Sequence, residues 1–278
     1  MTSLVVSPHF DDAILSLGGT IAKWTSAGER VVIANIYTTG PALAQVPASM
    51  RKFADYATRR AEDAAACAVV GAESRYLDRV ERAFRRPFLS DLQYFTTPRS
   101  RTGFGTLRDV TAAIESLFDP MPDRILLPLG IGNHVDHVET LLAATDCIEP
   151  GPQVAFYEDF YALSNTMRRD HPIARTALWE SAQSPLLRSR RLRLVLDEVA
   201  AARHGPSLDR LLGAPWNAAH WSVERSAITT YEATKLDAIR CYTSQTEAFG
   251  GFAGIARAMR AYHRFWGGSE PIWRAIFR

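Results

Sequence analysis

Two patterns of hydrophobic and polar positions alternate along the first half of the chain. Short apolar runs rich in β-branched residues predict strands at 4–6, 30–37, 75–77, 123–127 and 153–157. Apolar residues spaced by three and four predict helices over 14–24, 50–70, 106–118 and 138–147. This alternation predicts an α/β fold, with a Rossmann-like three-layer αβα arrangement around a mostly parallel sheet.

The pattern is less regular in the second half, after about residue 160. Apolar spacing predicts helices over 230–245 and 255–265, and arginines mix with leucines over 186–202. We interpret 159–230 as a cap or a strand pair that shapes a substrate pocket. We expect a single domain over 1–278, with its core at 1–158 and C-terminal helices over 231–278.

Composition and charge exclude several classes of protein. The 278 residues are 47% hydrophobic and carry a net charge of +2, too small to indicate binding to nucleic acid or to an anionic membrane. Neither an apolar run of about 18 residues nor a secretory signal is found, so we expect no membrane span. The three cysteines (Cys67, Cys147 and Cys241) fit neither a disulfide framework nor a CxxC zinc site. We therefore expect a reducing, cytoplasmic compartment, and leave a homo-oligomer open.

Histidines and aspartates gather after two of the predicted strands. One group follows the strand at 4–6, and the other follows the strand at 123–127. Ligands of parallel α/β sheets bind outside the carboxyl ends of the strands, so the two groups are expected to share one crevice. The residues are His9, Asp11, Asp12, His134, Asp136 and His137.

Two histidines and one carboxylate suffice as the protein ligands of a catalytic zinc ion. His9 and Asp12 are three residues apart on a turn entering a helix, and His137 can complete the set from across the crevice. We predict one Zn²⁺ per chain, although iron, cobalt or manganese suits the same ligands. Each motif alone also fits a plainer interpretation, since two aspartates before a helix form a common N-cap and HxxH can lie on a helix surface.

The remaining polar residues of the two groups suit catalysis beside such an ion. Asp11 is placed to act as general base on a water molecule. His134, in protonated form, can stabilise a tetrahedral oxyanion or protonate a leaving amine. Asp136 can hold a histidine ligand through its ring N–H.

These motifs resemble those of the PIG-L/LmbE-like deacetylases, which have (A/S)-H-P-D-D-E after the first strand and H-x-x-H after a later one. The resemblance implies the same roles: His9, Asp12 and His137 bind zinc, Asp11 is the base and His134 lies on the oxyanion side. Two positions depart from the pattern, because Phe10 and Ala13 replace the usual proline and glutamate. Neither is a ligand or the base in the family.

Further stretches resemble the family over most of the chain. They are 15–19, 59–62, 77–78 and 235–245. By this resemblance Asp78 contacts the substrate, although it could instead be a turn residue. Arg59 is a candidate for binding a sugar hydroxyl or a phosphate of the substrate, and could instead pair with Glu62 on its own helix. The stretch 156–162 also resembles some members, without an assigned role.

The resemblance implies a metal-dependent amide hydrolase that removes an acetyl group from an N-acetylated amino sugar or its glycoconjugate. An amidase acting on thiol conjugates of the mycothiol type is the nearest alternative. Two further alternatives are a non-catalytic carbohydrate-binding domain and an inactive member of the family, in which Phe10 and Ala13 mark the loss of activity. The sequence disfavours a plain binding domain, because no G-x-G-x-x-G follows the first strand.

Overall fold

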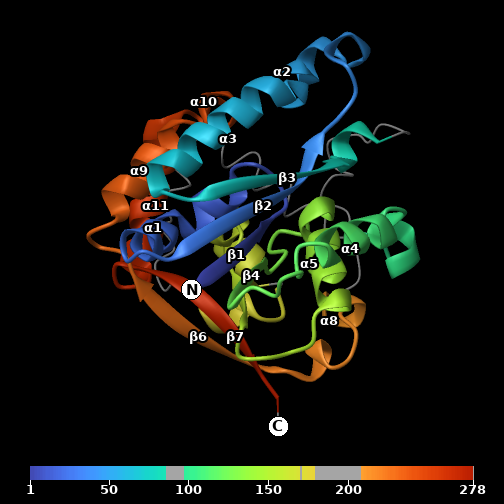
Figure 1. The fold of residues 1–278 in the computed structure, drawn as a ribbon, viewed down its shortest axis with the longest axis vertical. Helices are drawn as coiled ribbons and strands as arrows, with labels where there is room; N and C mark the ends of the chain where they lie inside the picture. The colour runs from blue at the N-terminus through green and yellow to red at the C-terminus, as the bar shows by residue number, and fades with distance from the viewer. Residues whose placement is uncertain (86–96, 170, 179–207, 278) are drawn as a thin grey trace.

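A computed structural model describes residues 1–85, 97–169, 171–178 and 208–277, and its strands form a seven-stranded sheet in the order β3-β2-β1-β4-β5-β7-β6 (Figure 1). The strands are β1 (Thr2–Ser7), β2 (Arg30–Thr39), β3 (Glu73–Val80), β4 (Arg124–Pro128), β5 (Val154–Tyr157), β6 (His220–Ala227) and β7 (Ser269–Ile276). Neighbouring strands from β3 to β5 pair in parallel, whereas β7 pairs antiparallel with both β5 and β6. The predicted α/β class with a mostly parallel sheet is confirmed.

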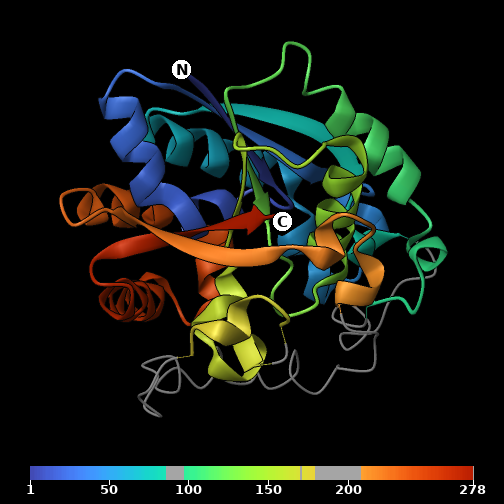
Figure 2. The same cartoon turned by 90° about the horizontal axis from the view of Figure 1, so that it is seen from below.

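Helices cover both faces of this sheet (Figures 1 and 2). On one side α1, α3 and α9 pack against one another, and on the other side α4 packs against α5. The helices are α1 (Asp12–Ser26), α2 (Arg51–Ala54), α3 (Tyr56–Val70), α4 (Leu107–Glu115), α5 (Val135–Cys147), α6 (Asn165–Arg169), α8 (Leu208–Leu211), α9 (Glu232–Arg240), α10 (Thr243–Thr246) and α11 (Phe252–Phe265). None of the described helices combines the length and the apolar character needed to cross a membrane.

Two of the predicted helices are each split into two. The helix expected over 50–70 breaks at Asp55, whose carboxylate accepts a hydrogen bond from the Thr58 amide and so caps α3. The helix expected over 230–245 breaks after Arg240, and the Glu62 carboxylate accepts a hydrogen bond from the Ser244 amide at the start of α10.

The C-terminal region contains strands that the sequence did not predict. The region 231–278 was expected to be helical, yet β7 follows α11 and joins the sheet between β5 and β6. A strand pair was one interpretation of 159–230, and β6 lies there, although its partner β7 lies outside that segment. The stretch 186–202 lies outside the described residues.

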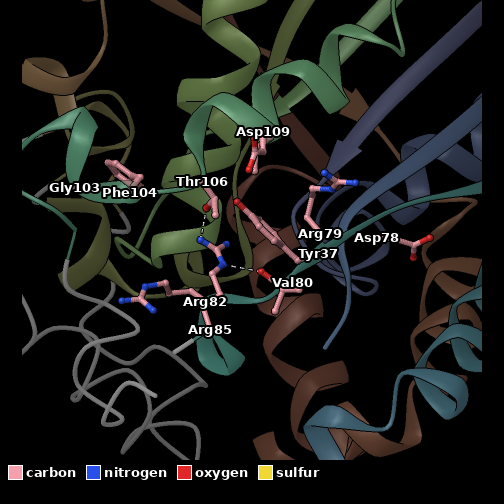
Figure 3. A pocket seen from close by; sticks show the side chains of 12 residues that line it. Tyr37, Asp78, Arg79, Val80, Arg82, Arg85, Gly103, Phe104, Thr106 and Asp109 are labelled. Carbon is pink, nitrogen blue, oxygen red and sulfur yellow. Dashed lines mark hydrogen bonds between the residues drawn. The ribbon is translucent and has the colours of Figure 1, made fainter. Parts of the chain in front are cut away.

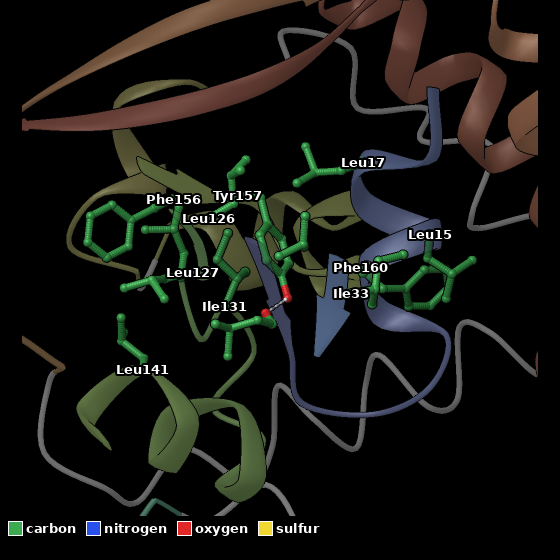
Figure 4. Close-up of a cluster of buried hydrophobic side chains, with 14 of the residues drawn as sticks. Leu15, Leu17, Ile33, Leu126, Leu127, Ile131, Leu141, Phe156, Tyr157 and Phe160 are labelled. Atoms are coloured by element: carbon green, nitrogen blue, oxygen red, sulfur yellow. Dashed lines mark hydrogen bonds between the residues drawn. The ribbon is translucent and has the colours of Figure 1, made fainter. Parts of the chain in front are cut away.

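A fully buried core joins the sheet to its helices. Leu17 of α1, Ile33 of β2, Leu126 of β4 and Phe156 of β5 contribute to it (Figure 4). Tyr157, at the end of β5, donates a hydrogen bond of 2.9 Å from its hydroxyl to the carbonyl of Val6 in β1. The carboxyl ends of β1, β4 and β5 are therefore firmly held relative to one another.

One carboxyl group within the packed helices predicts a measurable pH dependence of stability. Burial raises the pKa of Asp63 on α3 to about 6. In the unfolded chain this group titrates near its ordinary value, so between about pH 4 and pH 6 only the folded state holds the proton. Stability therefore falls as pH rises through this window, by about 3 kcal/mol for this group. Urea unfolding across pH 4–7 should show this loss relative to Asp63→Asn, in which the group no longer titrates.

A constant difference between the two proteins across that range would contradict the raised pKa. Comparison with the variant matters because other acidic groups titrate in the same window and contribute equally to both proteins.

Candidate active site

The two predicted groups of histidine and aspartate meet at the carboxyl edge of the sheet. β1 leads into the loop 8–11 and α1, and its neighbour β4 leads into the loop 129–134 and α5. The second loop turns tightly, with φ +73° at Gly130 and +90° at Gly132. A side chain at Gly132 would come within 2.7 Å of Tyr161, so this position requires glycine. His134 is the N-cap of α5, so His137 lies in the first helical turn rather than in a loop.

Three side-chain atoms form an equilateral triangle at this edge. His9 Nδ1 lies 3.2 Å from Asp12 Oδ2 and 3.2 Å from His137 Nε2. Asp12 Oδ2 and His137 Nε2 are also 3.2 Å apart. Ligands about 2.1 Å from a tetrahedral metal ion stand about 3.4 Å from one another, so this donor set fits zinc. The sequence predicted these three residues as the ligands, and the structure brings them together.

Each histidine of the triangle is held from behind by a carboxylate. His9 turns Nε2 away from the triangle toward Asp136 Oδ2, at 3.2 Å. His137 turns Nδ1 toward Asp159 Oδ1, at 2.7 Å. Carboxylates in this position fix the orientation of a metal-binding imidazole and raise its basicity. Asp136 therefore occupies the place expected from its predicted role of holding a histidine.

Sequence reasoning gave Asp159 no role. Its second oxygen accepts a hydrogen bond of 2.9 Å from the Ile131 amide, so it also fixes the loop that leads to His137. Asp159 follows β5, whose carboxyl end lies at the same edge as those of β1 and β4. Its position after a predicted parallel strand was a signal that places it at this edge, without assigning it a role.

Asp136 is surrounded by donors. The backbone amide of Arg82 lies 3.0 Å from Oδ2, and Arg85 Nη2 lies 2.9 Å from Oδ1. Burial opposes ionisation, but the hydrogen bond to His9 and the charge of Arg85 lower the pKa of Asp136 to about 2. With 1% of its surface exposed, this carboxylate orients His9 and is closed to a substrate.

The electrostatics of the triangle favour a cation at its centre. Burial alone would lower the pKa of His137, but the carboxylates of Asp12 and Asp159 raise it to about 9. Burial likewise opposes ionisation of Asp12, yet His137 and His9 hold the pKa of Asp12 well below its usual range. The buried carboxylates stabilise a positive charge on the imidazole rings. They would stabilise the positive charge of a metal ion at the same place.

Asp11 stands beside the triangle without contributing to it. It is the N-cap residue of α1 and its side chain is half-buried. Burial and the neighbouring charge of Asp12 raise the pKa of Asp11 to about 6. A carboxylate with such a pKa is suited to accept a proton near neutral pH.

His134 lies close to both histidines of the triangle. Its ring stands 5.0 Å from that of His9 and 4.9 Å from that of His137, between centroids. Nitrogens of the three rings lie within 4.8 Å of one another, so three histidines form a second potential ligand group. In the set of His9, Asp12 and His137 the ligand atoms are 3.2 Å apart. This spacing fits tetrahedral zinc more closely than that of the three-histidine group.

The protonation of His134 differs from the expected one. Burial, with the charges of His137 and His9, holds the pKa of His134 well below its ordinary value, so the ring is neutral. The Asp136 amide donates to His134 Nδ1 at 3.3 Å, which leaves the proton on Nε2. A neutral ring with Nε2–H is still a hydrogen-bond donor.

Arg59 lies behind the loop that carries Asp11. Only 3% of the residue is exposed, and its guanidinium forms an ion pair with Glu81. Its alternative partner, Glu62, instead bonds Thr243 and Ser244. Direct contact of Arg59 with a substrate stays a prediction.

Asp78 is placed at the end of β3, away from the triangle. Its carboxylate accepts hydrogen bonds from Thr38 Oγ1 at 3.0 Å and Arg60 Nη2 at 2.8 Å. The backbone of Asp78 is left-handed, with φ +52°, but the residue lies within β3, where the pairing with β2 shifts register, so the turn interpretation was wrong. Its contact with a substrate also stays a prediction.

A cavity of about 710 Å³ opens between β3 and α4 (Figure 3). Tyr37 and Arg85 separate it from the triangle, since the Tyr37 ring lies 6.0 Å from that of His9 and Arg85 bonds Asp136. Other lining residues include Asp78, Arg79, Arg82, Phe104 and Asp109. This cavity borders the candidate active site, but His9, Asp12 and His137 are not among its lining residues.

Fold and site together define an α/β protein with a histidine–carboxylate centre at the carboxyl edge of a parallel sheet. The model of the PIG-L family, GlcNAc-PI de-N-acetylase, matches residues 4–148, just over half of the chain. The chain therefore belongs to this family, and the resemblance of its two motifs is confirmed.

The comparisons also find individual relatives. The chain is 29% identical over 163 residues to 2'-N-acetylparomamine deacetylase of Streptomyces fradiae, and the match covers 56% of each chain. The chain thus matches about half the length of that curated relative.

Solved structures resemble nearly the whole chain. The zinc-inhibited form of teicoplanin deacetylase Orf2 has a TM-score of 0.68 at 19% identity, over 99% of this chain and 98% of the other. The A40926 pseudoaglycone deacetylase Dbv21 has a TM-score of 0.62 at 21% identity, over 99% and 96%. At these identities the structures show a shared fold.

Proposed function

We propose that the protein is a zinc-dependent amide hydrolase that removes an acetyl group from an N-acetylated amino sugar or its glycoconjugate. The observation that carries this proposal is the triangle of His9, Asp12 and His137, with Asp11 beside it and outside the ligand set. Family membership and the deacetylase named among the relatives support the choice of reaction. Iron, cobalt or manganese would suit the same donors.

A bound Zn²⁺ would supply a Lewis acid that activates water and polarises the amide carbonyl. His9, Asp12 and His137 would hold it, and Asp136 and Asp159 would keep the two imidazoles in the binding orientation.

Asp11 and His134 would perform the proton transfer and the charge stabilisation. Asp11 takes a proton from the attacking water and delivers it to the leaving nitrogen, so the products are acetate and an amine. Neutral His134 donates its Nε2–H to the oxygen that gains negative charge. This role needs a donor and not a protonated ring, which agrees with the lowered pKa of His134.

The substrate would be a small amino sugar or a glycoconjugate, met in a reducing cytoplasm. The three cysteines are free in the structure, which agrees with such a compartment. The cavity beside Tyr37 offers room for part of a conjugate next to the reacting amide.

Metal content and amine release test this proposal together. The purified protein should hold about one zinc ion per chain and release amine from N-acetylglucosaminides or N-acetylated aminoglycosides. Removal of the metal with a chelator should abolish release, and added Zn²⁺ should restore it. A protein without affinity for Zn²⁺, or one whose amine release survives complete metal removal, would overturn the proposal.

A further inference from the structure

The loop between β1 and α1, together with the first residue of α1, carries three of the proposed active-site residues, and bonds from β2 and within the loop hold its ends. The Pro8 carbonyl accepts a hydrogen bond of 2.9 Å from the Tyr37 amide. Ser7 Oγ donates to the His9 carbonyl at 2.6 Å and accepts from the Ala13 amide at 3.1 Å. The middle of the loop, at Phe10, depends on groups from other elements.

The side chain of Phe10 is fully buried against two of these elements. Its ring centroid lies 5.7 Å from that of Tyr76 on β3 and 5.1 Å from the Arg59 guanidinium on α3. Proline at this position would restrict the backbone by its own ring. Here packing of the Phe10 ring restrains the side chain, and the backbone carbonyl needs a separate restraint.

Tyr242 supplies that restraint. Its hydroxyl donates to the Phe10 carbonyl at 3.0 Å and lies 2.9 Å from Asp63 Oδ1. The residue is 1% exposed and stands at the break between α9 and α10. If the chain continued as one helix, as the sequence suggested, Tyr242 would occupy a different position relative to the loop.

The hydrogens of this pair can be counted. The Tyr242 hydroxyl has one proton, and it cannot donate that proton to both the Phe10 carbonyl and an ionised Asp63. Both contacts are satisfied below about pH 6, where Asp63 holds its proton and donates it to the Tyr242 oxygen while Tyr242 donates to Phe10. Asp63 Oδ2 accepts from Asn35 Nδ2 at 3.1 Å, which leaves Oδ1 as the protonated oxygen. Burial of Asp63, at 0% exposure, favours its neutral form.

We propose that Tyr242, oriented by Asp63, is a positioning residue that fixes the loop carrying His9, Asp11 and Asp12 through the Phe10 carbonyl. This inference rests on the proposed function for its catalytic consequence, whereas its effect on metal affinity can be measured without any substrate. The Tyr242 hydroxyl bonds the Phe10 carbonyl and Asp63 and none of the three proposed ligand atoms, so its effect on the metal site passes through the loop.

Substitution of Tyr242 by phenylalanine tests the proposal. The matched control is Thr145→Val, which also removes a buried hydroxyl bonded to a backbone carbonyl, that of Leu141. Thr145 lies near the carboxyl end of α5, at the opposite end of that helix from His137, so the control costs stability without loosening the loop. The measurements are the Kd for Zn²⁺ by competition with a chromophoric chelator, kcat, KM and Tm.

Tyr242→Phe is expected to weaken zinc binding about tenfold and to lower kcat with KM unchanged, because outer contacts of metal ligands have effects of this size. Thr145→Val should lower Tm while zinc affinity and kcat stay at the wild-type values. Equal zinc affinity and kcat in the two variants would overturn the inference. If the wild type binds no zinc, the proposed function itself fails, and that result is distinct.

Asp63→Asn provides a second, conservative variant. Its amide can donate to Tyr242 and accept from Asn35, as protonated Asp63 does. At neutral pH a pKa of about 6 leaves most of Asp63 ionised, so zinc affinity at or above the wild-type value is expected for Asp63→Asn, and a loss is expected for Asp63→Ala. A loss in Asp63→Asn equal to that in Tyr242→Phe would contradict the part assigned to Asp63.

Discussion

Asp11→Asn is expected to lower kcat by about 10²–10⁴-fold, the range that a positioned general base contributes, while zinc stays bound. Asparagine has the shape of aspartate but cannot accept a proton from water. Asp11 contributes none of the three atoms that form the ligand triangle, so its loss leaves the proposed metal site intact. Steady-state amine release and metal analysis of the same preparation measure the two quantities.

The matched control for this substitution is Asp237→Asn, on the exposed face of α9. The Asp237 carboxylate contacts Arg240 at 3.9 Å, and both side chains are largely exposed. Its removal is expected to leave kcat and zinc content unchanged. An Asp11→Asn protein that turns over at the wild-type rate would exclude Asp11 as the base. One that loses zinc would instead indicate that Asp11 belongs to the ligand set.

The proposed metal ligands were accessible from sequence because they follow strands. The apolar runs before His9 and His134 predict buried parallel strands, and neighbouring parallel strands end at one edge. Asp159 follows a strand in the same way, but it lacks a motif around it. A single aspartate after a strand has too many other uses for its role to be inferred from sequence.

Residues that act through tertiary contacts were beyond the reach of the sequence. Apolar spacing continues across the break at Tyr242, so the pattern predicts one helix and hides the contact with Phe10. Arg59 has a potential partner one turn away on its helix, yet it pairs with Glu81, 22 residues later. Spacing along the chain indicates only which ion-pair partners are close in sequence. Folding can place a partner from a distant segment closer to the side chain.

β7 was missed for a related reason. Its sequence contains Pro271 and the charged residues Glu270 and Arg274, which lower the apparent strand preference. In the structure Glu270 is fully buried, because it accepts hydrogen bonds from the Gly19 and Thr20 amides and from Lys235 Nζ. The charge is compensated by distant groups, which no local pattern reports.

His137→Ala is expected to remove both zinc and activity, because it takes away one of the three proposed ligands. Without its partner, Asp12 would also become a buried carboxylate with less compensation, so Tm should fall. Zinc per chain, measured after dialysis against metal-free buffer, is expected to drop from about one to near zero. His263→Ala is the control, since His263 is an equally buried histidine that hydrogen-bonds to Glu232 on α9. That variant should lose stability but keep zinc and turnover.

Asp159→Asn extends this test to a graded series. The substitution keeps the shape of the side chain beside His137 Nδ1 but removes its charge, so the imidazole becomes a weaker ligand. Zinc affinity or kcat is expected to fall by about 10–100-fold, well short of the loss in His137→Ala. A His137→Ala protein that keeps stoichiometric zinc would show that the ion binds elsewhere, with the three-histidine group excluded as well. If Asp159→Asn matches the wild type in both quantities, the Asp159 carboxylate only fixes the loop at Ile131 and does not tune the metal site.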